Sequence, residues 1–193
     1  MELLDPNKWV NNFVINAYLE LLTKNNSRFG YIPTYVVTYF RKDGIIIEDW
    51  FNSITLEHLI KIEYWLIPAH LNNTHWALAA FGVRINWMTF YDSLNPGIEM
   101  MEKNEFRENI LNFFKILYQQ KSGVMAFDPE ETEWFDIDDV PRQGNEIDCG
   151  IFLMMFAKDI INREKLLPNF NVSQEKIYEC RWKIFNELAA ERL

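Results

Sequence analysis

One cysteine of the chain lies where its sulfur could act as a nucleophile. Cys149 follows Asp148 and precedes Gly150 and an apolar run over residues 151–161, so the sequence predicts a thiol in the first turn of a helix. Asp148 is a favourable N-cap residue, and Gly150 leaves the approach to the sulfur open. Unpaired backbone N–H groups and the helix dipole stabilise a thiolate at such a place. We therefore expect Cys149 to be an exposed, reactive thiol, although a lone cysteine is otherwise a small buried hydrophobe.

A histidine and an aspartate could serve this thiol. His75 begins an apolar run over residues 75–81, and Asp92 follows a second run over residues 87–91. Imidazole can take and return a proton near neutral pH. If the two runs are neighbouring antiparallel strands, the start of one lies beside the end of the other, so Asp92 can accept the Nδ1–H of His75. A structural histidine and a turn aspartate are the alternative interpretations.

A glutamine completes the set of residues that could do chemistry. Gln143 lies six residues before Cys149 and could donate its amide to an oxyanion, together with the backbone N–H of Cys149. Otherwise it is polar loop surface. These residue types are those of a cysteine protease. The two cysteines and three histidines show no metal-ligand spacing, so we expect no metal and no cofactor.

Composition limits the class of protein and its partners. The chain has 193 residues, of which 49% are hydrophobic and 16% aromatic, so residues 1–193 are expected to form a single catalytic domain. A net charge of −9 disfavours nucleic acid and anionic membranes as partners. Two cysteines make no disulfide framework, and we find no secretory signal and no apolar run that could span a bilayer. We expect an intracellular monomer in the nucleus or cytoplasm.

Apolar periodicity predicts the elements that must position these residues. Residues 35–40 could form a strand or a buried helix, residues 41–44 are a turn signal, and residues 92–97 are a predicted loop. Helices over a central sheet, without strict alternation of strand and helix, predict an α+β fold. The predicted helices cover residues 6–23, 55–62, 101–118, 149–161 and 172–191, and the predicted strands cover 64–67, 75–81, 87–91 and 134–137.

Several motifs occur in the order found in one protease family. The pairs and triplets are His-Trp at 75–76, Asp-Ser-Leu at 92–94, and Pro-x-Gln-x-Asn-x-x-Asp-Cys-Gly at 141–150. In this order they resemble the ubiquitin-like-protein-specific proteases, the SENP/Ulp family of SUMO proteases. The resemblance covers nearly the whole chain, because residues 8–15 and 181–188 are similar to that family's opening and closing helices.

The resemblance implies a fold, an activity and the roles of four residues. The implied fold is that of the papain-like cysteine proteases, with a central mixed sheet flanked by helices. Cys149 would be the nucleophile, His75 the general base and then acid, Asp92 the residue that orients the imidazole, and Gln143 a member of the oxyanion hole. The implied activity is that of a thiol protease or isopeptidase that cleaves after the C-terminal Gly-Gly of a ubiquitin-like modifier, with SUMO as the first candidate.

The resemblance also implies residues that bind substrate. Trp9 and Trp76 match the family's two tryptophans that form a narrow tunnel over the Gly-Gly tail, which only residues without a Cβ could thread. Core packing is the alternative for both tryptophans. Asn12 and Asn145 are the other implied substrate-binding residues. Core packing is expected for Trp65, Trp87 and Trp182.

Departures from the family's pattern leave the identity of the modifier open. Arg142 stands where a second glutamine is common, and Asn12 replaces an aspartate that can contact SUMO. The segment Leu-Leu-Asp-Pro at 3–6 resembles deneddylases, so a Nedd-type modifier or ubiquitin is a close alternative. Two alternatives of other classes remain, an acyltransferase that uses the same thiol and a non-catalytic module that binds modifiers.

Overall fold

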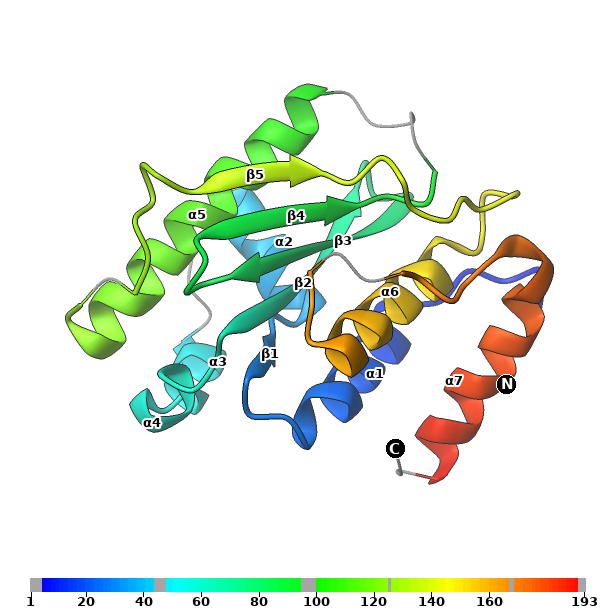
Figure 1. The fold of residues 1–193 in the computed structure, drawn as a ribbon, viewed down its shortest axis with the longest axis horizontal. Helices are drawn as coiled ribbons and strands as arrows, with labels where there is room; N and C mark the ends of the chain where they lie inside the picture. The colour runs from blue at the N-terminus through cyan, green and yellow to red at the C-terminus, as the bar shows by residue number, and fades with distance from the viewer. Residues whose placement is uncertain (1–4, 44–47, 95–99, 125, 167–168, 191–193) are drawn as a thin grey trace.

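The computed structural model describes residues 5–43, 48–94, 100–124, 126–166 and 169–190. A mixed sheet lies at the centre with helices on both of its faces, so the predicted α+β class is confirmed (Figure 1). The helices are α1 (Asn12–Lys24), α2 (Thr34–Asp43), α3 (Glu48–Ser53), α4 (Leu56–Leu59), α5 (Met100–Ser122), α6 (Cys149–Arg163) and α7 (Ile177–Ala190), with a 3₁₀ turn η2 at Gln174–Lys176. The strands are β1 (Phe29–Tyr31), β2 (Tyr64–Leu71), β3 (His75–Gly82), β4 (Trp87–Tyr91) and β5 (Glu133–Asp136).

The sheet has the strand order β1-β2-β3-β4-β5 among the described residues. The outer pairs β1–β2 and β4–β5 are parallel, and the inner pairs β2–β3 and β3–β4 are antiparallel. The antiparallel pairing of β3 with β4, in which Leu78 lies opposite Tyr91, confirms the pairing expected from the sequence. The first residue of β3 and the residue after β4 therefore meet at the same edge of the sheet.

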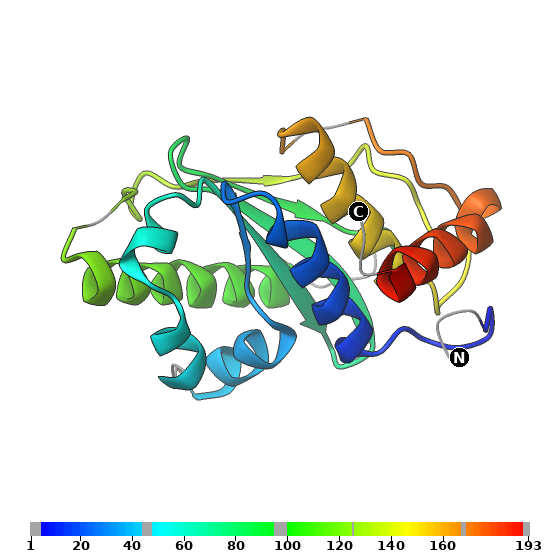
Figure 2. The same ribbon diagram turned by 90° about the horizontal axis from the view of Figure 1, so that it is seen from below.

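Strand β3 shows why the sheet needs helices on both faces. Leu78 and Ala80 belong to a hydrophobic cluster that includes residues of α1, α6 and α7. Ala79 and Phe81 belong to a second cluster with residues of α2, α3 and α5. Successive side chains of a strand point to opposite faces, so a strand that is apolar at every position must be covered on both. Figure 2 shows the two groups of helices on opposite sides of the strands.

Helix α6 is the most deeply placed element of the first group. Every residue from Cys149 to Ile161 is buried, and the helix packs on β3 and against α1. Each large apolar side chain that leaves water contributes about 1.5–3 kcal/mol to folding. The burial of this apolar run fixes the helix against the sheet, and its first residue, Cys149, is fixed with it.

The first helix begins later than its periodicity predicts. Helix α1 starts at Asn12, and the side chain of Asn11 caps it by accepting the N–H of Val14 at 3.0 Å. The preceding residues form a turn in which Asp5 accepts the N–H of Asn7 through its side chain and the N–H of Lys8 through its carbonyl. An Asx turn of this kind competes with helix formation. Residues 5–11 therefore form no helix.

Other segments also differ from the sequence-based expectation. Residues 35–40, which could be a strand or a helix, belong to α2, where Val36 and Val37 are buried and the helix packs against β2 and α5. The short elements β1 and α3 were not predicted, and α7 begins only after η2. Gly44 of the expected turn and residues 95–97 of the expected loop lie outside the described residues.

Candidate active site

Cys149 is the first residue of α6, as its neighbours in the sequence predict, but the prediction that it is exposed is wrong. Only 1% of its surface is accessible. Gly150 has a different role from the expected one, because a Cβ there would lie 3.0 Å from Cβ of Val10 and 3.6 Å from Cδ1 of Ile15. The missing side chain lets the N-terminal segment pack over the start of the helix. Val10 and Cys149 belong to the same hydrophobic cluster of buried residues.

His75 and Asp92 meet at the end of the β3–β4 pair. Nε2 of His75 lies 2.7 Å from Oδ1 of Asp92, and the same oxygen accepts the N–H of Leu94 at 2.9 Å. The expected contact through Nδ1 is therefore wrong, because the ring presents Nε2 to the carboxylate. Cys149 is close enough to His75 to raise the pKa of the imidazole, and Nδ1 is the ring nitrogen that does not face Asp92. The structure thus brings the predicted thiol, imidazole and carboxylate together in one line.

Two charged groups stabilise each other in this line. Burial by itself lowers the pKa of His75, but hydrogen bonds to Asp92 and Cys149 and their charges outweigh it and raise the pKa to about 9. Burial raises the pKa of Asp92, but the hydrogen bonds from His75 and from the Leu94 N–H outweigh it, so the pKa lies below its usual value. An imidazolium beside a sulfur stabilises a thiolate, which is the form that attacks carbonyl carbons.

The charged state of His75 predicts how stability depends on pH. Unfolded His75 loses its proton near pH 6.5, whereas folded His75 keeps it to a pKa of about 9, so the folded state binds more protons between these values. This contribution to stability is complete below pH 6.5 and is lost as the pH rises through 9. We expect the free energy of unfolding to fall by roughly 2–3 kcal/mol over this window, since one pKa unit is about 1.4 kcal/mol. Urea unfolding at several pH values, compared between the unaltered chain and His75→Gln, measures it. Equal pH slopes in the two proteins would contradict the prediction.

Gln143 is buried beside the loop that follows β4. Its Oε1 accepts the hydroxyl of Ser93 at 2.6 Å, and its backbone N–H donates to the Ser93 carbonyl at 2.9 Å. One N–H of its Nε2 donates a hydrogen bond to the carbonyl of Asn145. A carboxamide carries two N–H donors, so one remains for a ligand. Arg142 supports the same loop by donating to the carbonyl of Asp92 at 2.8 Å.

The two predicted substrate tryptophans line one cleft. Trp9, Asn12 and Trp76 line a cleft of about 530 Å³, together with His70. Trp9 is 45% exposed, whereas Trp76 is buried and stacks on His70 with ring centroids 4.1 Å apart. Because His70 and Trp76 are cross-strand partners in β2 and β3, the sheet supports the inner wall of the cleft. The outer wall comes from the N-terminal segment.

Asn145, the fourth predicted substrate-binding residue, does not line this cleft. Its Nδ2 donates to Oδ2 of Asp148 at 2.7 Å, and its Oδ1 accepts the N–H groups of Ile147 and Asp148. The side chain therefore organises the loop in front of α6. Asp148 is correspondingly not the side-chain cap that its position predicts, because it makes no capping hydrogen bond to α6. Its carboxylate instead forms an ion pair with Arg181, a residue that the sequence pattern did not single out.

The remaining aromatic and cysteine predictions have mixed outcomes. Trp65 is buried as expected, but Trp87 and Trp182 are 40% and 41% exposed, so the prediction that they pack in the core is wrong. Cys180 is a buried free thiol on α7, and burial raises its pKa. The described residues hold no group of three or more His, Cys, Asp or Glu side chains suited to a metal. They also hold no helix with the length and apolarity that a bilayer requires.

The chain is similar to proteins named as ubiquitin-like-specific and sentrin-specific proteases. It is 29% identical over 168 residues to the ubiquitin-like-specific protease ESD4 of Arabidopsis thaliana, and the aligned region covers 81% of this chain and 33% of that protein. It is 25% identical over 191 residues to human sentrin-specific protease 2, and the aligned region covers 93% of this chain and 30% of that protein. The chain thus spans about a third of the length of these relatives.

A solved structure shares the fold. The X-ray structure of the C-terminal Ulp1 protease domain in complex with SMT3, the yeast ortholog of SUMO, matches with a TM-score of 0.79 at 18% identity. The match covers 97% of this chain and 80% of that one. The chain has the fold of that protease domain, and the predicted mixed sheet flanked by helices is confirmed. The model of the Ulp1 protease family, C-terminal catalytic domain, matches residues 8–192, and the chain belongs to that family.

Proposed function

We propose that this chain is a cysteine peptidase that cleaves after the C-terminal Gly-Gly of a ubiquitin-like modifier, with SUMO as the first candidate. The substrates would be modifier precursors, conjugates or both. The observation that carries the proposal is the grouping of three side chains: His75 contacts Asp92 at 2.7 Å, and Cys149 is close enough to raise the pKa of His75. Family membership and the names of the two relatives support the same activity.

The first chemical step forms a thioester. The Cys149 sulfur, deprotonated beside the imidazolium of His75, attacks the carbonyl carbon of the last glycine. The negative charge that develops on the carbonyl oxygen is stabilised by the second N–H of Gln143 and by the backbone N–H of Cys149, which as the first residue of a helix has no intrahelical acceptor. The bond to the leaving nitrogen breaks, and His75 gives that nitrogen a proton.

The second step releases the modifier. Neutral His75 takes a proton from a water molecule, and the resulting hydroxide attacks the thioester carbon. The C–S bond breaks and restores the thiolate beside the imidazolium, and the released glycine carboxyl group gives its proton to solvent and leaves as the carboxylate. Asp92 holds the ring by its Nε2–H throughout, so that Nδ1 always faces the sulfur and the reacting atoms. All proton transfers use side chains of this chain and water.

The cleft supports the proposed preference for a Gly-Gly tail. Trp9 and Trp76 line it from the outer and inner sides, and Asn12 lies at the same cleft. A tail without Cβ atoms would pass between two facing indole rings more easily than one with side chains. We propose that this passage aligns the terminal carbonyl with Cys149. We also propose that residues 1–193 act as a single catalytic domain inside the cell, in the nucleus or the cytoplasm.

Labelling with electrophilic modifiers tests the proposal. SUMO, a Nedd-type modifier and ubiquitin, each carrying a C-terminal electrophile, are incubated separately with the full chain. We expect SUMO to form an adduct that mass spectrometry locates on Cys149. If only the Nedd-type modifier or only ubiquitin forms an adduct, that modifier, and not SUMO, is the substrate. The absence of any adduct, together with acetyl transfer from acetyl-CoA or modifier binding without reaction, would overturn the proposal.

Replacing Trp9 tests the cleft. We expect Trp9→Ala to raise the KM for a SUMO C-terminal conjugate by roughly 10- to 100-fold, because the outer wall over the tail is removed while the thiol and imidazole remain. Trp87→Ala is the matched control, since Trp87 is 40% exposed where Trp9 is 45% exposed and does not line the cleft. Steady-state kinetics measure both variants. Equal KM values for Trp9→Ala and the unaltered chain would contradict the assignment.

A further inference from the structure

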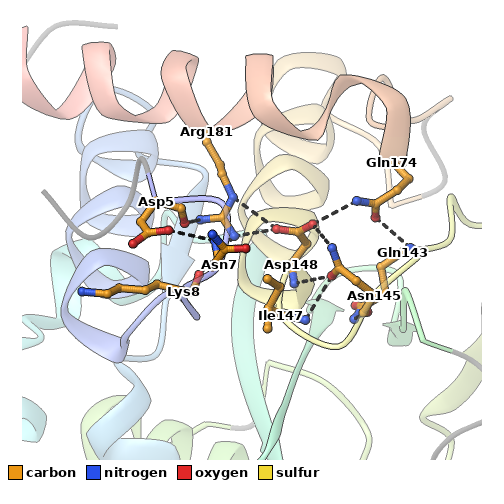
Figure 3. Close-up of polar contacts among 10 residues, drawn as sticks. Asp5, Asn7, Lys8, Gln143, Asn145, Ile147, Asp148, Gln174 and Arg181 are labelled. Carbon is orange, nitrogen blue, oxygen red and sulfur yellow. Dashed lines mark hydrogen bonds and ion pairs between the residues drawn. The ribbon is translucent and has the colours of Figure 1, made fainter.

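A buried guanidinium joins the nucleophile to the last helix. Arg181 of α7 has 0% of its surface exposed, and its Nη2 and Nε donate to Oδ1 of Asp148 at 2.5 and 3.2 Å (Figure 3). Asp148 is itself buried and directly precedes Cys149. The ion pair therefore fixes the backbone at the point where α6 begins.

The same guanidinium holds the N-terminal segment. Its Nη1 donates to the carbonyl of Asp5 at 3.3 Å, and its Nη2 donates to the carbonyl of Lys8 at 3.2 Å. Lys8 directly precedes Trp9, which is the outer wall of the cleft. Because residues 5–11 belong to no helix or strand, these contacts and the packing of Val10 on Gly150 hold the segment that carries Trp9. Figure 3 shows Arg181 between Asp148 and the segment that carries Asp5 and Lys8.

The second carboxylate oxygen of Asp148 extends the network to the loop that carries Gln143. Oδ2 accepts Nδ2 of Asn145 at 2.7 Å and Nε2 of Gln174 at 3.0 Å. Gln174 in turn accepts the N–H of Gly144 at 2.7 Å. Each oxygen of the carboxylate thus receives two hydrogen bonds, which is its full capacity. The thiol, the outer wall and the Gln143 loop are all tied to one ion pair.

We propose that Arg181 is a positioning residue that sets the place of Trp9 relative to Cys149. The proposal rests on the proposed function, because it concerns the cleft through which the modifier's tail would pass. A planar guanidinium can donate to a carboxylate and to two carbonyls at once, whereas the ammonium of lysine is a point charge on a flexible stem. Lysine at this position would keep the charge opposite Asp148 and lose the geometry.

Two substitutions separate the two arms of the network. In Arg181→Lys we expect the KM for a fluorogenic SUMO conjugate to rise about tenfold, with kcat and the rate of Cys149 alkylation by iodoacetamide within about threefold of the unaltered chain. In Asp148→Asn we expect kcat and the alkylation rate both to fall by about tenfold, because the loop before the thiol loses its ion pair. Lys183→Met, an exposed cation on the same helix, is the control and should change neither.

A stabilising ion pair without a positioning role gives different results. In that case each loss of activity follows the loss of folded protein, and the folded fraction of each variant retains the unaltered kcat, KM and alkylation rate. That outcome would overturn the proposal. If Arg181→Lys does not fold, amide hydrogen exchange in Asp148→Asn tests the proposal instead. Faster exchange at residues 5–9 than in the unaltered chain supports the proposal, and unchanged exchange overturns it. If the unaltered chain cleaves no modifier conjugate, the proposed function fails, whereas alkylation and exchange still test the network.

Discussion

Replacing Cys149 by alanine is expected to lower kcat/KM for a SUMO conjugate by at least about 10⁴-fold while the protein remains folded. Alanine has no atom that could form the thioester, so the covalent route is closed. The fold should tolerate the change because Cys149 is 1% exposed and a buried cysteine behaves as a small hydrophobe. The loss of one sulfur atom from the start of α6 costs about 1 kcal/mol of stability.

Cys180→Ala is the matched control for this variant. It also removes a buried thiol, but from α7 and away from His75, so the unaltered rate is expected. Thermal unfolding and hydrolysis of the conjugate are measured on both proteins. Turnover by Cys149→Ala within about tenfold of the unaltered chain would exclude the sulfur as the nucleophile.

Asp92→Asn is expected to lower kcat/KM by roughly 10²- to 10⁴-fold at neutral pH, the range that follows from loss of an orienting carboxylate in triad enzymes. The asparagine oxygen can still accept Nε2–H of His75, but the charge that raises the pKa of His75 is gone. The imidazole then stays neutral to lower pH and stabilises the thiolate less. The asparagine NH₂ would also take the place of Oδ2, a buried atom for which the described residues provide no hydrogen-bond partner.

The pH profile distinguishes this loss from simple destabilisation. Because His75 would lose its proton at lower pH in Asp92→Asn, the alkaline limb of kcat/KM should move to lower pH, below the pKa of about 9 of the unaltered chain. Asp139→Asn removes an equal charge from an exposed site shortly before Gln143 and should leave both the rate and the profile unchanged. A profile that keeps its shape in Asp92→Asn would argue against the orienting role.

Local patterns predicted the elements that carry the chemistry. The apolar run after Asp148 is long enough to require a buried helix, and it places Cys149 at the start of α6. Two short apolar runs separated by a tight turn pair as antiparallel neighbours, and this fixes His75 near Asp92. In both cases the signal lies within a few residues, so the sequence alone contains it.

Contacts between distant segments could not be predicted in this way. Val10 packs closely on Gly150, next to the buried Cys149, and the local sequence does not encode that approach. The ring orientation of His75 depends on where α6 places the sulfur. Arg181 binds a carboxylate 33 residues before it and a carbonyl 173 residues before it, so neither partner is visible from its own helix. The exposure of Trp87 and Trp182 likewise depends on which faces the fold leaves uncovered.

The cleft has walls of unequal resistance to local unfolding. Trp76 is part of the central sheet, whereas Trp9 lies in a segment without regular structure that a few side-chain contacts hold in place. A segment such as the one that carries Trp9 unfolds locally at a lower free energy than the core, and it can do so while the core stays folded. In mild denaturant we therefore expect binding of the substrate tail to be lost first. Cys149 lies on the buried helix α6 and keeps its reactivity until the whole domain unfolds.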